Sequence, residues 1–217
     1  MFILKKLLSL FSILFAGKTK EKIDNSLPQP EEKKKMKKGI IVCLDAGHGG
    51  ADPGAIHPKK NPKYIESHLV LEICEHLAYS LDDEGYDVTV TRADNDSPIS
   101  KIDRINRIKA AKADLLISIH CNSFHKPAYG IETLYNSSNP DSMKLAKNIQ
   151  KSLKTTFVNH KDRGIKVRDK LYVLKTMSPS ALVEVEFINT AGEFIQDNTE
   201  ELAQAIFEGI ENFYKEL

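Results

Sequence analysis

Short, unbroken apolar runs separated by helix-like segments are the feature that most constrains the fold of this chain. Residues 39–47 (GIIVCLDAG) and residues 114–122 (DLLISIHCN) are apolar almost throughout and end in turn-forming or polar residues. Such runs are typical of strands that are buried on both faces. Between them, residues 66–84 carry apolar side chains at helical spacing, and Gly85 is placed to end that helix.

The rest of the chain continues this alternation of strands and helices. It predicts βαβ units, and therefore an α/β fold: a single domain with a mainly parallel, twisted sheet flanked by helices. Asp141 or Ser142 is the expected cap of the helix that begins near residue 141. Further strands are expected at residues 86–92, 130–136, 170–175 and 181–189, and further helices at residues 99–112, 141–157 and 200–217.

The first 38 residues differ from the rest in composition. Lys5 and Lys6 precede an apolar run that ends at Gly17 and is too short to cross a bilayer comfortably as a helix. This pattern is typical of a secretory signal; an uncleaved membrane anchor and an ordinary amphipathic helix are the alternatives. Residues 18–38 are charged, contain proline and have few apolar side chains, which predicts a linker. We therefore expect a signal peptide or anchor at residues 1–17, a linker at 18–38 and a folded domain at 39–217.

Charge and cysteine content exclude several classes of protein. Residues 1–39 hold ten lysines and four acidic residues, a net charge of +6, so the rest of this +1 chain carries −5. A mildly acidic domain argues against binding to nucleic acid, which needs a basic face. Cys43, Cys74 and Cys121 are widely spaced within apolar stretches, which predicts buried free thiols and no disulfide or cysteine-ligated zinc.

Four polar side chains stand at positions that the pattern places in the core or at strand ends. His48 follows the first strand in a glycine-rich turn, and His120 lies near the end of the strand at 114–122. Glu184 lies inside the strand at 181–189, and Glu66 shares the apolar stripe of the helix that it begins. Sites in open α/β sheets lie beyond the carboxyl ends of the strands, and a buried carboxylate needs an ion-pair partner or a bound cation.

Two histidines and a glutamate are a known ligand set for catalytic zinc, which leaves one coordination position for water. A carboxylate that does not bind the metal is then needed to take a proton from that water. Spacing alone does not separate Glu184 from Glu186 in this role, because alternate residues of a strand share a face. Each residue also has a structural alternative: a loop or core histidine, a first-turn acid favoured by the helix dipole, or a buried ion pair. All four together favour a metal site.

From about Ile40 to its end, the chain resembles the zinc-dependent N-acetylmuramoyl-L-alanine amidases, the amidase-3 family of bacterial peptidoglycan hydrolases. The similar segments occur in the family's order, and the pair DAGHGG and SIHCN followed by an LVE strand is the specific part. These segments are IVCLDAGHGGADPGA, Glu66 at the head of a helix, TRADN, ADLLISIHCNSF, GIETLYN, RGIK and SPSALVEVEFINT.

The resemblance implies that His48, Glu66 and His120 bind one Zn²⁺ ion and that Glu184, directly after the LV of LVE, is the catalytic glutamate. It implies hydrolysis of the amide between the lactyl group of N-acetylmuramic acid and L-alanine, in peptidoglycan or muropeptides. Residues 39–217 would then be a catalytic amidase domain, expected to be monomeric, exported and active in the periplasm or another extracytoplasmic part of the envelope. Another zinc hydrolase, such as a carboxypeptidase, and a wall-binding protein without catalysis are the alternatives.

Two departures from the family pattern bear on the site. Glu186 stands where the family usually has glycine or a small residue, and a second buried carboxylate beside Glu184 would raise the pKa of one of the two. The arginine that usually precedes the second histidine has two candidates here, Arg104 and Arg107.

Overall fold

The computed structural model describes residues 39–176 and 179–217. The segments expected to be a signal or anchor and a linker lie outside the described residues. In the described part of the chain, every helix is too short or too polar to cross a membrane.

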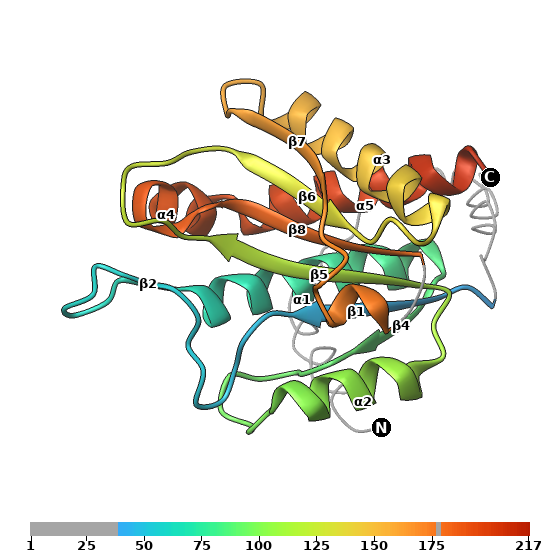
Figure 1. The fold of residues 1–217 in the computed structure, drawn as a ribbon, viewed down its shortest axis with the longest axis horizontal. Coiled ribbons are helices and arrows are strands. Elements are labelled where there is room, and N and C mark those ends of the chain that lie inside the picture. Colours follow the sequence, from blue (N-terminus) through green and yellow to red (C-terminus); the bar gives the residue numbers. More distant parts are fainter. Residues whose placement is uncertain (1–38, 177–178) are drawn as a thin grey trace, which may run out of the picture. The chain divides into compact units, whose positions relative to one another are not determined.

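A six-stranded sheet forms the centre of the domain (Figure 1). All neighbouring strands are parallel except β8 and β6, which are antiparallel, so the predicted α/β class with a mainly parallel sheet is confirmed. In spatial order the strands are β4 (Asp87–Val90), β1 (Ile41–Ala46), β5 (Leu115–Asn122), β8 (Ser180–Phe187), β6 (Ile131–Tyr135) and β7 (Asp162–Val167).

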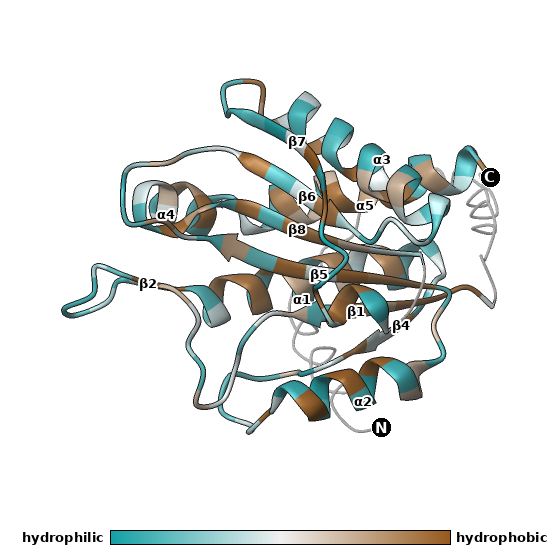
Figure 2. Cartoon of the chain, viewed as in Figure 1, coloured by the Kyte–Doolittle hydropathy of each residue, from teal (hydrophilic) through white to brown (hydrophobic). Residues whose placement is uncertain are grey.

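Helices cover the two faces of the sheet unequally. Three helices lie on one face: α1 (Glu66–Glu84) and α3 (Pro140–Thr156) pack on the strands, and α5 (Thr199–Lys215) packs against both of these helices. On the other face, α2 (Lys101–Ala111) buries Ile108 against Cys43 and Leu116. Figure 2 shows the apolar residues concentrated along β1, β5 and β8, between these layers. The strands in the middle of the sheet are therefore buried on both faces, as their unbroken apolar runs predict.

The prediction of a strand at residues 170–175 is wrong. Residues Val173–Lys175 form a short 3₁₀ turn, η1, and Leu174 packs on Leu134 and Leu182 of the sheet. The strand next to β6, at that edge of the sheet, is β7, which contains the RGIK segment. A run of a few apolar residues predicts burial but does not separate a strand from a helical turn that packs on a sheet.

Smaller differences concern the ends of elements. Helix α3 is capped by Asn139, whose side chain accepts from the Asp141 backbone N–H, with Pro140 at the first helical position. The expected strand at 181–189 ends at Phe187, where α4 (Ile188–Asp197) begins. A two-stranded ribbon of β2 (Ile56–His57) and β3 (Tyr64–Ile65), which the pattern did not predict, lies between β1 and α1.

All three cysteines are buried and free, as expected. Burial is the main cause that raises the pKa of the Cys43 thiol, to about 11. These thiols fill the core and form no part of the site.

Candidate metal centre and general base

The turn after β1 holds His48 in a left-handed backbone conformation, with φ of 59°. Two flanking glycines allow other groups to approach this turn. A Cβ atom on Gly47 would lie 2.3 Å from Cε1 of His120, and one on Gly54 would lie 2.7 Å from Glu66 Oε2. Real Cβ atoms do not come this close, so glycine at both positions is needed for the three side chains to meet.

Arg92 binds the backbone of this turn from the end of β4. Arg92 is 3 % exposed, and its guanidinium donates to the carbonyl oxygens of Ala46 (3.0 Å), Gly47 (2.8 Å) and Ser67 (2.7 Å). Since Ser67 follows Glu66 in α1, one arginine connects the His48 turn to the first turn of that helix. Five fixed N–H donors make arginine suited to satisfying several buried carbonyls at once.

Arg104 binds the same turn from α2. It pairs with Asp45 at 2.5 Å, donates to the Ala46 carbonyl at 2.7 Å and also donates to the His48 carbonyl. Among the described residues, Arg107, the other candidate for the family's arginine, donates to the Thr91 carbonyl and not to the His48 turn. Of the two arginines on α2, Arg104 is therefore the one that supports the turn.

Asp45, the carboxylate that pairs with Arg104, is 1 % exposed. Burial alone raises the pKa of a carboxyl group, but the Arg104 charge and hydrogen bonds from Ser118 and Thr91 outweigh it. The pKa of Asp45 is therefore lowered, and the group is a carboxylate at neutral pH.

His48, Glu66 and His120 converge on one point, with one ligand atom from each within 4.8 Å of the others. Glu66 Oε1 lies 3.2 Å from Nε2 of His48 and 3.0 Å from Nδ1 of His120. The two imidazole rings stand edge to face, 5.0 Å apart. Ligand atoms 2.0–2.1 Å from a tetrahedral ion are roughly 3.3 Å apart, so this set fits a small divalent ion such as zinc.

Backbone groups fix the carboxylate of this cluster. Glu66 Oε1 accepts from the Cys121 N–H at 3.0 Å, and Oε2 accepts from the Ala55 N–H at 2.8 Å. Burial opposes ionisation of Glu66, but hydrogen bonds and charge from the two histidines lower its pKa far below the usual value. Glu66 is therefore an anion that is held in place before any cation binds.

His48 is oriented by Asp52, four residues along the chain. Asp52 Oδ2 lies 2.9 Å from Nδ1 of His48, and Asp52 Oδ1 accepts from the Gly54 N–H at 3.1 Å. Burial lowers the pKa of His48, but its contacts with Glu66 and Asp52 outweigh this and raise the pKa to about 9. With Nδ1 turned to Asp52, Nε2 faces the cluster, which is a common arrangement for a metal-binding histidine.

Glu184 lies beside this cluster in the sheet. It pairs with His120 of β5 on one side and with Glu132 of β6 on the other. Its Oε2 atom is buried and has no hydrogen-bond partner among the described residues. Burial is the main cause that raises its pKa to about 7, with smaller opposing contributions that include the His120 charge. A buried carboxyl group that titrates near neutrality is suited to accepting and returning a proton.

The amidase-3 family profile, described as N-acetylmuramoyl-L-alanine amidase, matches residues 42–212. The chain belongs to this family.

Individual relatives support the assignment. An uncharacterised Bacillus subtilis protein, YqiI, is 34 % identical over 81 % of this chain and 85 % of its own length. The amidase LytC of the same organism is 32 % identical over 82 % of this chain, which spans 36 % of LytC. The solved structure of the Clostridioides difficile CwlD amidase, in complex with the GerS lipoprotein, is 30 % identical with a TM-score of 0.74, covering 82 % of this chain and 100 % of that one. The activity of this chain is therefore that of an N-acetylmuramoyl-L-alanine amidase acting on cell-wall peptidoglycan.

Glu186 of this amidase is not a second carboxylate of the site, so the expectation that it shares a face with Glu184 is wrong. Between the pairs His120–Glu184 and Asn122–Phe187, β8 advances three residues while β5 advances two. This bulge breaks the alternation of side chains. Glu186 is 0 % exposed and instead accepts from the Gly130 N–H at 2.5 Å and contacts His160 at 3.0 Å.

Sequence reasoning missed three residues that shape the site: Asp52, Arg92 and Glu132. Asp52 and Arg92 lie in segments that carry the family resemblance, but no spacing rule predicts that one orients a ligand and the other binds a turn. Glu132 carried a signal, because it is a charged residue inside the apolar segment at 130–136.

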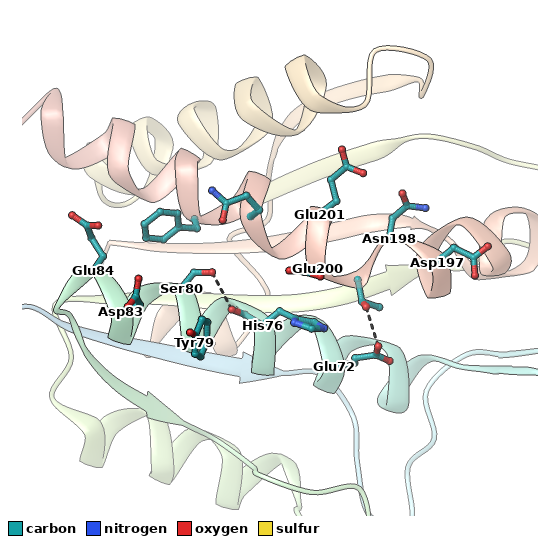
Figure 3. A pocket seen from close by; sticks show the side chains of 13 residues that line it. Glu72, His76, Tyr79, Ser80, Asp83, Glu84, Asp197, Asn198, Glu200 and Glu201 are labelled. Atoms are coloured by element: carbon teal, nitrogen blue, oxygen red, sulfur yellow. Dashed lines mark hydrogen bonds between the residues drawn. The ribbon is translucent and has the colours of Figure 1, made fainter. Parts of the chain in front are cut away.

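A cavity of about 810 Å³ elsewhere in the amidase contains none of the four site residues. It lies between α1 and the start of α5, and Figure 3 shows acidic side chains around it, among them Glu72, Asp197 and Glu200. Thr199 closes part of its wall by donating to Glu72 at 2.9 Å. This cavity therefore lies outside the cluster of His48, Glu66 and His120 and the neighbouring Glu184.

Proposed function

We propose that His48, Glu66 and His120 bind one zinc ion and that Glu184 is the proton-transfer residue of the amidase. The observation that carries this proposal is the convergence of two imidazole nitrogens and one carboxylate oxygen beside a buried, unpartnered carboxyl group. Bound zinc would supply Lewis acidity, which polarises the scissile carbonyl and makes a water molecule more acidic.

Glu184 performs the proton transfers in this proposal. Its carboxylate accepts a proton from the attacking water, whose oxygen bonds to the carbonyl carbon. When the carbon–nitrogen bond breaks, Glu184 returns the proton to the alanine nitrogen, and the products are a muramoyl carboxylate and a free amine. A pKa of about 7 allows both transfers near neutral pH.

We also propose that residues 39–217 act as a monomeric catalytic domain, and that residues 1–17 direct export or anchor the protein while residues 18–38 link the two. The positively charged start and the short apolar run support export. The family's substrate supports it as well, because peptidoglycan lies outside the cytoplasmic membrane.

Digestion of purified sacculi tests the proposed reaction. We expect the zinc-loaded protein to release new free amino groups on alanine and to stop after a chelator removes the metal. Zinc added back should restore the rate. Shortened stem peptides without new alanine ends would instead indicate a carboxypeptidase and overturn the proposal.

The contact between Asp52 and His48 gives a graded test of the metal site. We expect Asp52→Asn to weaken zinc affinity by about 10–100-fold, because the amide orients the imidazole less strongly than a carboxylate does. Competition with a coloured chelator measures this independently of turnover. Asp96→Asn, on an exposed loop outside the cluster, is the matched control and should leave the affinity unchanged. Equal affinities for the Asp52 variant and the unaltered protein would remove Asp52 from the site.

A further inference from the structure

We propose that Arg163 and Lys166 on β7 bind a carboxylate on the second residue of the substrate's peptide. This inference rests on the proposed function, because it assumes that the scissile amide lies at His48, Glu66, His120 and Glu184. In this inference Arg163 and Lys166 select the substrate's peptide and take no part in the proton transfers.

The two cations converge on one carboxylate. Arg163 Nε lies 2.6 Å from Glu132 Oε2, and the Lys166 ammonium binds the same oxygen. The other oxygen, Glu132 Oε1, accepts from the Asn122 side chain at 3.2 Å. Glu132 is 5 % exposed, so these contacts keep it ionised and lower its pKa against the effect of burial. Among these three groups, two positive charges against one negative charge leave an excess of +1, and Glu184, opposite Glu132 on β8, is the next carboxyl group on this face.

This excess charge lies on the face of the sheet that carries Glu184. Glu132 and Glu184 are directly opposite each other on β6 and β8, and paired residues point to the same face. Lys166 pairs with Leu134, which shares that face with Glu132 because alternate residues do. Neighbouring strands are about 4.8 Å apart, so β7 lies roughly 10 Å from β8.

Arg163 is held in place but keeps N–H donors that have no partner among the described residues. Its guanidinium lies 5.0 Å from the centre of the Phe187 ring, and its Nη1 contacts the Tyr129 carbonyl at 3.5 Å. A Cβ atom on Gly130 would lie 2.7 Å from Cγ of Arg163, so the glycine makes room for this side chain. The side chains of Arg163 and Lys166 remain 26 % and 32 % exposed, so a ligand can reach both cations.

The chemistry of the substrate places the carboxylate on its peptide side. The muramoyl side offers no free carboxylate near the bond, because its lactyl carboxylate is the acyl group of the scissile amide. An extended peptide advances about 3.3–3.6 Å per residue, so a carboxylate on the second residue lies roughly 7–10 Å from the scissile carbonyl. The backbones of β8 and β7 are about this far apart, and the head groups of Arg163 and Lys166, which meet Glu132 over β6, lie within this reach. The peptide would then lie across β6, with its carboxylate at Arg163 and Lys166.

Two soluble N-acetylmuramoyl peptides test this inference. They are identical except that the second residue carries free carboxylate in one and carboxamide in the other. We expect the unaltered protein to prefer the carboxylate form roughly tenfold or more in kcat/KM, mainly through KM, because a charge-assisted hydrogen bond to a remote group contributes to binding. Lys166→Met should reduce this preference to within about threefold.

Controls separate substrate recognition from a structural role. Lys147→Met removes an exposed charge on α3 and should keep the full preference. If Lys166 only neutralised Glu132, its loss would slow both substrates equally, and an equal loss overturns the inference. If Lys166→Met does not fold, Arg163→Lys retains the charge but loses the fork geometry, and it should lower the same preference. Equal turnover of both peptides by the unaltered protein overturns this inference alone, whereas no turnover of either peptide overturns the proposed function and the inference together.

Discussion

Glu184→Gln is expected to lower kcat by about 10²–10⁴-fold while the protein keeps its bound metal. Glutamine has nearly the same shape as glutamate but cannot accept a proton from water near neutral pH. Because Glu184 is not among the three converging ligands, metal content should stay at one ion per chain. Steady-state rates on a soluble muramoyl peptide, together with metal analysis of the same preparation, measure both quantities.

Glu186→Gln is the matched control for this substitution. It makes the same chemical change two residues away, in the same strand, at a carboxylate that contacts Gly130 and His160 and not the cluster. We expect kcat to stay within a few-fold of the unaltered protein's value, provided that thermal unfolding shows a folded chain. A Glu184 variant with full activity, or a Glu186 variant as inactive as the Glu184 variant, would contradict the assignment.

The strands that carry the site could be predicted because their apolar runs are unambiguous. Burial on both faces allows no alternation in β1, β5 and β8, so a histidine or glutamate near their ends is visible against its neighbours. Glu66 could be recognised for a related reason, since it occupies the buried stripe of α1. Their closeness in space then follows from the rule that the carboxyl ends of parallel strands form one edge.

Other parts of the site were not predictable because they depend on contacts that no period encodes. A bulge is one additional residue in a strand, and residues 184–187 contain no glycine or proline to indicate it. Arg104 and Arg107 are three residues apart on one helix and are equivalent by pattern. Only the packing of α2 against β1 gives Arg104 access to Asp45. The family resemblance selects Glu184 over Glu186 because it compares positions and does not rely on periodicity.

His48→Ala is expected to remove stoichiometric zinc and, with it, detectable hydrolysis of sacculi. The substitution deletes one of three ligand atoms and leaves Glu66 with a single imidazole partner. It also removes the side chain that Asp52 orients. Metal analysis after gel filtration and a sacculus-clearing assay measure the two losses separately.

His68→Ala is the control for the loss of a histidine as such. His68 is exposed on α1, two residues after Glu66, and it lies outside the converging group. We expect this variant to keep one zinc ion per chain and full clearing activity. Retention of zinc by His48→Ala would show that the imidazole is not a ligand. Loss of zinc from both variants would mean that the metal depends on the integrity of α1 rather than on convergence at the edge of the sheet. Only loss confined to His48→Ala agrees with a site in which the turn after β1, the strand β5 and the helix α1 each contribute one ligand.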